Sequence, residues 1–361
     1  MNNKILQFLF IFTGIVTMFT AKAQDTTNAF GFNFNKVKPI VQVFGTASYN
    51  VNDNFYSYGF GRAHLGFQYK FNEKWSSKII IDRGKPTTIG QITVSDSADN
   101  LLNVQNSSKE GAYYTMFLKF ASLQWKVNEK LKLEGGAILQ NHYITQERFW
   151  GYRYVAQTFQ DRYYHTSSTD LGFIGYYKFN DKFGFDVALT NGEGVRVIQD
   201  KFGKVKIAAG FDLKPLKGLQ IRIYYANKTS GDSINNKAQQ LISVFAGYKH
   251  PKYFRVGGEF NYQQNHLNIK DEDLFGYSIF GSYIFSNKFE IFVRFDKLIS
   301  NTKAGENKHW HFYNDGSAII TAFHYLPVKG VNLSLNYQGW IPDNNDLNFQ
   351  NHVLLNFEYK F

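Results

Sequence analysis

The sequence predicts an all-β fold, a transmembrane antiparallel β-barrel of about 16 strands with both termini in the periplasm. Three observations lead to this prediction. Apolar and polar residues alternate over many short segments, very short polar turns join these segments in pairs, and aromatic residues make up 18% of the chain. In a barrel that crosses a membrane, one face of each strand meets lipid and the other meets a wet lumen, which produces such alternation.

The N-terminus has the features of a secretory signal peptide. Lys4 precedes a mostly apolar stretch at 5–19, and Ala21 and Ala23 supply the small residues of a cleavage site. An N-terminal membrane anchor is the alternative, but about 15 apolar residues are few for a spanning helix. We therefore predict a cleaved signal peptide over 1–23 and a single barrel domain over 24–361.

The composition excludes several classes of protein. The chain has no Cys, which excludes disulfides, thiolate chemistry and a lipoprotein anchor. A helical membrane protein needs about 20 consecutive apolar residues per span, and no second run of that kind is present. The net charge is +11, of which Lys4 and Lys22 leave with the signal peptide. The remaining basic balance favours acidic lipid or anionic solutes, and we expect no nucleic-acid partner for an exported protein.

Seven very short turns separate the alternating segments in pairs. Asn, Asp, Gly and Pro provide the turn geometry, and the aromatic residues beside several turns are typical of a membrane interface. The turns lie at 71–75, 127–131, 179–183, 214–218, 250–252, 285–289 and 327–330. Eight longer connections alternate with them. Short turns at one end and longer connections at the other are typical of outer-membrane barrels, whose short turns face the periplasm.

Between the turns the hydrophobic period is two, as in strands with one apolar face. In 253–263, for example, Val256 and Phe260 share one face while Glu259 and Asn261 share the other. This pattern predicts strands at 38–50, 58–71, 75–83, 112–126, 131–140, 168–179, 183–190, 205–214, 219–228, 239–249, 253–263, 274–285, 289–297, 315–326, 331–340 and 349–361.

One strand breaks the alternation. The segment 112–126 changes phase near Lys119, which predicts a β-bulge or a misregister at that position. The longest connections are expected near 84–111, 141–167 and 298–314.

A soluble β-sandwich would also alternate, with the apolar face turned inward. Periodicity alone does not say which face looks outward. The signal peptide, the aromatic-flanked turns and the unequal connections favour the barrel. The terminal Phe361 resembles the C-terminal recognition signal of outer-membrane barrels, so we predict the outer membrane as the location.

Residues 131–194 resemble the phosphate-selective porin O and P family. The resemblance rests on LKLEGGAILQ at 131–140, ITQERFWGYRY at 144–154 and TDLGFIGYYKFNDKFGFDVALTNGEG at 169–194, in that order. Glu147-Arg148 and Asn191-Gly192 hold the places of the family's Glu-Arg pair and Asn-Gly pair. The resemblance implies a 16-stranded, usually trimeric, anion-favouring porin with a loop folded inward. The chain departs from the family at 136–139, where the strand motif is less polar, and it has no dense ladder of Arg or Lys. A general porin is therefore the safer prediction.

Nine basic residues are the candidates for the pore lining or its constriction. Arginines beside a lumen can stabilise phosphate, sulfate or carboxylate by charge and paired hydrogen bonds, and rings of basic residues select anions in pores. The candidates are Arg62, Lys78, Lys206, Arg222, Arg255 and Arg294 on strands, and Arg148, Arg153 and Arg162 in the loop at 141–167. Acidic residues share the inward faces: Asp82, Glu134, Asp186, Asp212, Glu259, Glu290 and Asp296. For any single Arg, pairing across the wall to hold the barrel is the alternative.

The loop at 141–167 is the expected constriction. Its arginines alternate with six aromatic residues: Phe149, Trp150, Tyr152, Tyr154, Tyr163 and Tyr164. These rings could form a stacking surface for sugars or pack the loop against the inner wall, and packing is favoured for most of them.

The sequence thus predicts an outer-membrane porin for passive diffusion of small hydrophilic solutes, with a mild preference for anions such as phosphate. We expect no cofactor, no metal site and no enzymatic activity, since no catalytic motif is found. Expected partners are outer-membrane lipid and lipopolysaccharide, small anionic or polar solutes and, from the resemblance, a homotrimer. Two alternatives stay open. One is a non-conducting barrel in adhesion or secretion, and the other is a barrel hydrolase that uses His142 or His165.

Overall fold

The computed structural model describes residues 32–84, 92–95, 101–104, 115–142, 144–197, 203–230 and 237–361. The chain divides into two units, one that ends at Lys38 and a second from Pro39 to Phe361. In the first unit, the 3₁₀ turn η1 (Phe34–Lys36) begins after Asn33, whose side chain accepts a hydrogen bond from the Asn35 N–H. The expected signal peptide at 1–23 lies outside the described residues.

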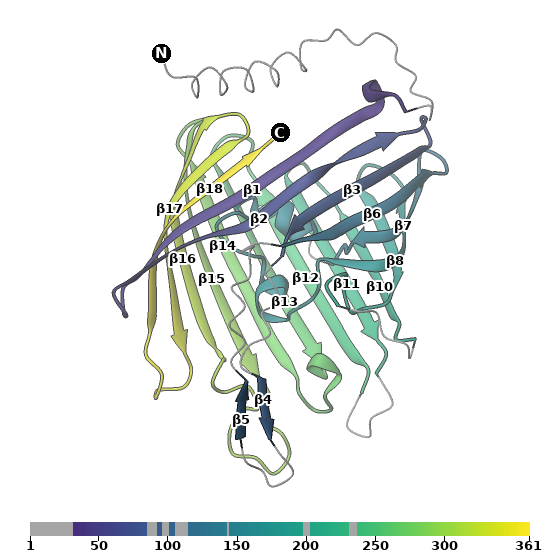
Figure 1. The fold of residues 1–361 in the computed structure, drawn as a ribbon. Coiled ribbons are helices and arrows are strands. Elements are labelled where there is room, and N and C mark those ends of the chain that lie inside the picture. Colours follow the sequence, from purple (N-terminus) through teal and green to yellow (C-terminus); the bar gives the residue numbers. More distant parts are fainter. Residues whose placement is uncertain are drawn as a thin grey trace, which may run out of the picture. The chain divides into compact units, whose positions relative to one another are not determined.

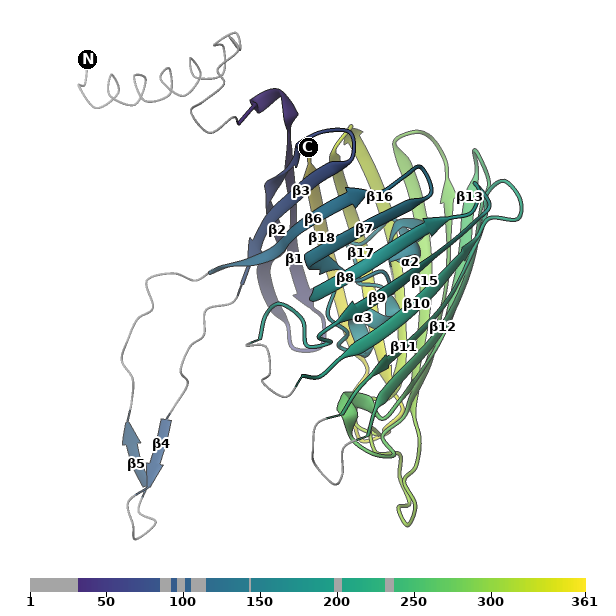
Figure 2. The ribbon, with the colours of Figure 1, turned by 90° about the vertical axis from the view of Figure 1, so that its right-hand side faces the viewer.

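The second unit is a sheet closed on itself (Figures 1 and 2). Its 16 described strands all pair antiparallel, in the order β1-β18-β17-β16-β15-β14-β13-β12-β11-β10-β9-β8-β7-β6-β3-β2. A separate hairpin of β4 (Ile92–Ser95) and β5 (Leu101–Val104) lies in the connection between β3 and β6. The barrel strands are β1 (Val37–Asn50), β2 (Phe55–Lys70), β3 (Trp75–Arg83), β6 (Met116–Lys126), β7 (Leu131–Leu139), β8 (Thr169–Lys178), β9 (Phe183–Thr190), β10 (Lys206–Leu213), β11 (Leu219–Lys228), β12 (Gln239–Lys249), β13 (Phe254–Gln264), β14 (Leu274–Ile284), β15 (Phe289–Ser300), β16 (Gly316–Val328), β17 (Val331–Pro342) and β18 (Gln350–Lys360).

The predicted fold class is confirmed, and most strand ends agree within three residues. The predicted bulge is also present: Ile80 pairs with Phe120 and Ile81 with Leu118, so Lys119 is the extra residue between them. The sequence analysis missed the β4–β5 hairpin. It also expected a longer connection between β1 and β2, where the structure has only residues 51–54.

The apolar face of each strand looks outward. On β13, Val256 and Phe260 are 45% and 49% exposed, whereas Glu259 and Asn261 are 6% and 0% exposed. The same holds on β9, where Val187 and Leu189 face out and Asp186 is buried inside. A closed sheet satisfies its backbone hydrogen bonds internally and can present this apolar surface to lipid. The molecule is therefore an outer-membrane barrel.

The two ends of the barrel differ. All seven predicted turns lie at one end, here called the short-turn end. The last strand also ends there, beside the first part of β1. Val41 of β1 and Phe361 exchange two backbone hydrogen bonds of 3.1 Å each. The other end, here called the loop end, carries the longer connections. In barrels of this type the short turns face the periplasm. Within the described residues, no helix is long and apolar enough to cross a membrane.

Candidate functional site

The connection between β7 and β8 folds into the barrel. This inward loop (residues 140–168) contains two short helices that the sequence analysis did not predict, α2 (Ile144–Trp150) and α3 (Phe159–Tyr163), and both lie inside the ring of strands (Figure 2). Trp150 is 1% exposed, and its ring centroid lies 4.9 Å from that of Phe280 and 5.0 Å from that of Phe292 on the wall. The loop aromatics thus pack against the wall, as favoured above.

Polar contacts fix the loop to β13 and β15. Gln160 Nε2 donates to Asn261 Oδ1 at 2.7 Å, and Arg294 NH1 donates to the carbonyl oxygen of Gln157 at 2.6 Å. Arg294 is itself held by Asp296, with Nε–Oδ1 2.7 Å. A buried charge is tolerated only when it is paired and hydrogen-bonded, so Arg294 serves as an anchor of the loop.

A second set of contacts reaches β16, β17 and β18. The Tyr154 hydroxyl lies 2.6 Å from His324 Nδ1, and Gln338 Nε2 donates to the Val155 carbonyl at 3.1 Å. Asn356 Nδ2 donates to the carbonyl of Tyr154 at 3.2 Å. Burial raises the pKa of Tyr154 above its usual range, so its hydroxyl stays protonated. Because these contacts span β13 to β18, the loop is fastened along one half of the wall.

Glycines on that wall make room for the loop. A Cβ at Gly276 would lie 1.9 Å from Phe159 Cζ, and one at Gly247 would lie 2.6 Å from the ring of Phe149. Both phenylalanines are buried. Any larger side chain at these positions would collide with the loop, so the absence of a side chain there admits the two rings.

Arg153 joins the two helices of the loop. Its Nε lies 3.1 Å from Glu147 Oε2 on α2, and its NH2 lies 2.6 Å from Asp161 Oδ2 on α3. One guanidinium therefore meets two carboxylates within the loop. The two carboxylates compensate the charge of Arg153, and the two ion pairs hold α2 and α3 together and so fix the shape of the loop.

On its other side the loop borders a lumen cavity of 740 Å³. The wall opposite comes from β1, β2, β3 and β6, and the loop contributes residues between 153 and 168. The charged lining is predominantly basic: Arg62, Arg83, Lys119, Arg153, Arg162 and Arg196 against Asp82, Asp161 and Glu193. Lys119 Nζ lies 2.7 Å from Asp82 Oδ2. Six bases against three acids leave a local excess of positive charge.

Arg162 occupies a particular position in this arrangement. It lines the lumen cavity and also a second cavity of 820 Å³ at the loop end, which Trp340 and His311 help to form. Its guanidinium carbon lies 5.4 Å from the centre of the Tyr163 ring. Within the described residues it makes no ion pair. Arg162 therefore presents its positive charge to both cavities.

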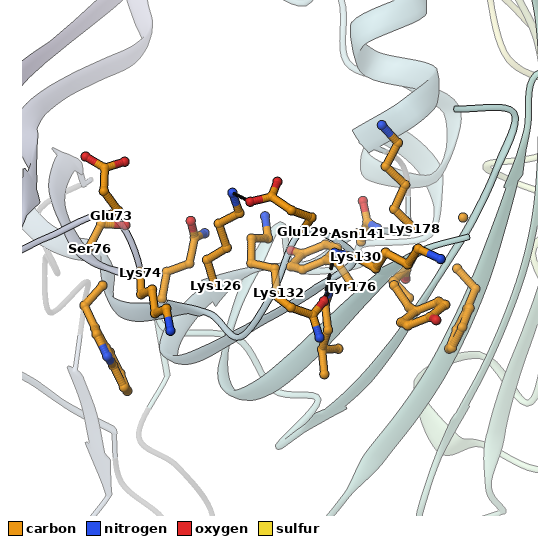
Figure 3. Close-up of a pocket in the computed structure, with 18 of the residues that line it drawn as sticks. Glu73, Lys74, Ser76, Lys126, Glu129, Lys130, Lys132, Asn141, Tyr176 and Lys178 are labelled. Carbon is orange, nitrogen blue, oxygen red and sulfur yellow. Dashed lines mark hydrogen bonds and ion pairs between the residues drawn. The ribbon is translucent and has the colours of Figure 1, made fainter. Parts of the chain in front are cut away.

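A third pocket, of 460 Å³, lies at the short-turn end (Figure 3). It is lined by six lysines and four acids: Lys70, Lys74, Lys126, Lys130, Lys132 and Lys178 with Glu73, Glu129, Asp186 and Asp212. Figure 3 shows Lys126 paired with Glu129, and Lys126 Nζ lies 2.7 Å from Glu129 Oε1. Basic residues thus lie at both ends of the lumen.

The nine candidate residues fall into four groups. Arg62, Arg153 and Arg162 border the lumen cavity, while Arg148 and Arg255 border a pocket of 770 Å³ at the short-turn end. In a third group, two lysines meet polar side chains: Lys78 Nζ lies 3.9 Å from Glu134 Oε1, and Lys206 Nζ donates to Gln140 Oε1 at 3.1 Å.

The fourth group consists of Arg222 and Arg294, which are buried in the wall beneath the loop. Arg222 is 0% exposed and meets Asp186 at 2.8 Å and Asp212 at 2.5 Å. Arg222 therefore makes the cross-wall pairs named above as the alternative.

Three basic residues of the cavity escaped the sequence analysis: Arg83, Lys119 and Arg196. Alternation could have marked Lys119 as inward, but the bulge shifts the phase at this residue. Arg83 is the last residue of β3, and Arg196 follows the Asn-Gly segment. The two-residue period of a strand therefore does not predict the direction of either side chain. Arg196 lies over the ring of Phe117, 4.6 Å from its centre.

The Asn-Gly segment itself has a structural role. Gly192 and Gly194 have φ of +85° and +82°, a region that favours glycine. Their N–H groups donate to the two carboxylate oxygens of Asp170, at 2.5 and 3.0 Å. Gln140 Nε2 donates to the same carboxylate at 3.1 Å. Asp170 thus ties this segment to the base of the inward loop.

The histidines considered for catalysis are separated in the structure. His142 is 0% exposed against Tyr224, with ring centroids 6.0 Å apart, and burial lowers its pKa well below the usual range. His165 is exposed and lines the loop-end cavity. Across the described part of the chain, no group of three or more His, Asp or Glu is placed to hold a metal ion.

No protein-family model matches the chain, and no curated protein matches its sequence. Solved structures do resemble it. OmpF of Salmonella typhi in complex with daunomycin superposes with a TM-score of 0.66 at 12% identity, over 90% of this chain and 97% of that one. The outer membrane channel DcaP of Acinetobacter baumannii gives 0.57 at 15%, over 90% and 97%. A trimer form of OmpT of Vibrio cholerae gives 0.56 at 11%, over 90% and 99%. At these identities the likeness shows a porin-like fold.

Proposed function

We propose that this outer-membrane barrel is a porin, a passive channel for small hydrophilic solutes with a mild preference for anions such as phosphate. The observation that carries the proposal is the lumen cavity between the inward loop and the wall of β1, β2, β3 and β6, where six basic residues stand against three acidic ones. Positive charge in a narrow lumen raises the local concentration of anions.

Arg162 is the residue proposed to set the preference. It lines both the lumen cavity and the cavity at the loop end, and it makes no ion pair with a described residue. By contrast, Arg153 is compensated by Glu147 and Asp161. Two unit charges about 4 Å apart in water interact by about 1 kcal/mol, which corresponds to roughly a fivefold change in local anion concentration. One arginine is therefore enough for a measurable preference.

Further parts of the proposal follow the sequence analysis. The protein would be exported by a signal peptide cleaved after residue 23, and it would lie among outer-membrane lipid and lipopolysaccharide. A homotrimer and a place near the phosphate-selective porin O and P group are also proposed, the first supported by the trimer form among the similar structures. The fold needs no cofactor for diffusion along a gradient.

The test is single-channel conductance of the refolded mature protein in a planar bilayer, with the reversal potential measured under a salt gradient. Stable open channels with an anion-leaning reversal potential are expected. Arg162→Gln should move the reversal potential toward the cation side, and Arg162→Glu should move it further. Lys237→Gln, an exposed lysine of the loop end, is the matched control and should leave it unchanged.

Three results would contradict the proposal. Well-folded, heat-modifiable protein without conductance would favour the adhesion or secretion alternative. Conductance with the same reversal potential in wild type, Arg162→Gln and Arg162→Glu would leave a channel without the assigned selectivity residue. Hydrolytic activity lost on substitution of His165 would favour the enzyme alternative.

A further inference from the structure

Five of the seven short turns share one construction. In each, the side chain of a turn residue accepts the backbone N–H of the lysine two positions later. Asn72, Asn128 and Asn180 do so with Lys74, Lys130 and Lys182, each at 2.8 Å. Ser286 does so with Lys288 at 3.2 Å, and His250 with Lys252 at 3.3 Å. Such side-chain caps fix the turn, so the five lysines take the same place in the five turns.

The two remaining turns also carry a lysine, so every short turn presents one. We call the seven the collar lysines: Lys74, Lys130, Lys182, Lys217, Lys252, Lys288 and Lys329. All seven are exposed, and none forms an ion pair with another residue in the part of the chain that the structure describes. Figure 3 shows Lys74 and Lys130 on their separate turns.

Two of the three acids of these turns pair with lysines outside the collar, and the third, Glu73, forms no ion pair in the part of the chain that the structure describes. Glu129 Oε1 lies 2.7 Å from Lys126 Nζ, and Asp181 Oδ1 lies 2.5 Å from Lys178 Nζ. Lys126 and Lys178 stand at strand ends, next to outward-facing Trp125 and Tyr177. Their hydrogen bonds and charge hold the pKa of Glu129 and of Asp181 below the usual range. The collar lysines therefore keep their charge uncompensated.

Charge is unevenly divided between the two ends of the barrel. The seven short turns contain eight lysines and three acids. The described connections of the loop end, apart from the inward loop, contain six Lys or Arg and nine acids. The excess of positive charge on the turns thus belongs to the short-turn end, and a partner of that end should be anionic.

Aromatic residues place the collar at the membrane surface. Four collar lysines directly precede an aromatic residue, and Tyr253 and Phe289 are 52% and 38% exposed. Trp75 stacks on Trp125 at 5.3 Å between ring centroids, on the outer side of the sheet. Aromatic rings gather at the level of lipid headgroups, and lysine side chains extend from there to the charged layer. The ammonium groups would therefore reach the headgroup phosphates.

We propose that the collar lysines bind the headgroup phosphates of anionic phospholipids, such as phosphatidylglycerol, in the leaflet at the short-turn end. Lysines on all seven turns encircle the barrel as surrounding lipid does, whereas a soluble acidic partner would need a patch on one side. A lysine close to an anionic membrane surface strengthens the association roughly fivefold. This binding surface is separate from the channel proposed above.

The test uses the full refolded chain in vesicles of phosphatidylcholine that contain brominated phosphatidylglycerol or, in parallel, brominated phosphatidylcholine. Bromine quenches nearby tryptophan, and Trp75 and Trp125 report on lipid at the collar. Half-maximal quenching should need several-fold less phosphatidylglycerol than phosphatidylcholine. The difference should shrink as salt is raised, because exposed charges are screened.

Three variants make the test specific. Lys74→Gln/Lys130→Gln/Lys182→Gln should lower the preference for phosphatidylglycerol, and Glu73→Gln/Glu129→Gln/Asp181→Asn should raise it. The matched control, Lys237→Gln/Lys270→Gln/Lys308→Gln at the loop end, should behave as wild type.

Equal quenching by the two lipids in wild type would overturn the proposal. That result is the one expected if the collar lysines bind a soluble acidic partner and no lipid. So would an equal loss of preference in the control. Heat-modifiable mobility shows that each variant is folded. The readout needs no conductance, so the failure of either proposal can be seen without the other.

Discussion

Phe159 of the inward loop fills the space above Gly276 of β14, where a Cβ would lie 1.9 Å from Phe159 Cζ. Phe159 is 0% exposed, and its neighbours include Tyr163 and Tyr164, with ring centroids 4.7 and 5.5 Å away. A glycine in the wall thus determines where the loop that narrows the lumen can rest.

Replacing this glycine should loosen the loop. Gly276→Val places methyl groups in the volume of the Phe159 ring, and overpacking of this kind costs about 1–3 kcal/mol. We expect larger and noisier single-channel currents from a barrel that still folds. Gly281→Ala on the same strand is the control, since its Cβ would meet Val256 at an ordinary 3.7 Å. Unchanged currents in Gly276→Val would show that the packing of Phe159 does not hold the loop.

Removing the buried guanidinium of Arg222 should destabilise the barrel. Arg222→Met leaves Asp186 and Asp212 facing each other without the charge that both contact. Breaking a buried pair by loss of one partner costs about 3–5 kcal/mol. The temperature at which the barrel loses its heat-modifiable mobility should fall clearly. Arg222→Met/Asp186→Leu/Asp212→Asn should recover part of that loss, and no recovery would argue against uncompensated charge as the cause.

Asp170 should control the segment at 191–194. Its two carboxylate oxygens accept the N–H groups of Gly192, Gly194 and Leu171. Asp170→Asn replaces one acceptor oxygen by a donor, and a lost charged hydrogen bond costs about 1.5–3 kcal/mol. We expect faster hydrogen exchange at the amides of Gly192 and Gly194. Glu193→Gln in the same segment is the comparison, and equal exchange in the two variants would contradict this role.

The loop end should open as the pH falls below 6.5. His266, in η2 (His266–Asn268), bonds Gln263 through Nδ1 and stacks on Trp310 at 5.8 Å. Burial lowers the pKa of His266 to about 4, and the nearby His165 and His311 contribute. Between about pH 6.5 and 4 the opened state binds more protons than the packed one, so the packed state loses stability as pH falls through this window.

The difference between a pKa of 6.5 and one of about 4 corresponds to about 3 kcal/mol of stability of the packed state. This stability is fully present above pH 6.5 and is lost below pH 4. Protease sensitivity of residues 265–273 measures the opening and should rise toward pH 4. His266→Gln should remove most of the pH dependence, because Gln does not titrate. A variant with the pH profile of wild type would assign the effect to Asp315 or the other histidines.

Local patterns of the sequence were sufficient for the barrel wall. Each strand alternates on its own, and each turn carries its own Asn, Pro or Gly, so strand ends could be placed to within about three residues. The phase change near Lys119 was visible for the same reason, since a bulge interrupts the period at the residue that leaves the ladder.

The candidate site was less accessible to such reasoning. The arginines of the loop could be found in the sequence. Only contacts made in the folded protein show which of them are paired with acids and which face a cavity. Arg153 meets Glu147 and Asp161, whereas Arg162 faces two cavities. Nothing local to Arg222 or Arg294 distinguishes them from Arg62, because their burial depends on a loop that begins more than fifty residues earlier in the chain.

By itself the sequence determined the wall of this protein: strands of period two, joined by short lysine-bearing turns, with a basic balance overall. The tertiary structure alone decided where the inward loop rests and which charges remain uncompensated. Alternation is a local property of the chain. The meeting of Phe159 with Gly276, or of Arg222 with Asp186, exists only after the sheet has closed and the loop has folded into it.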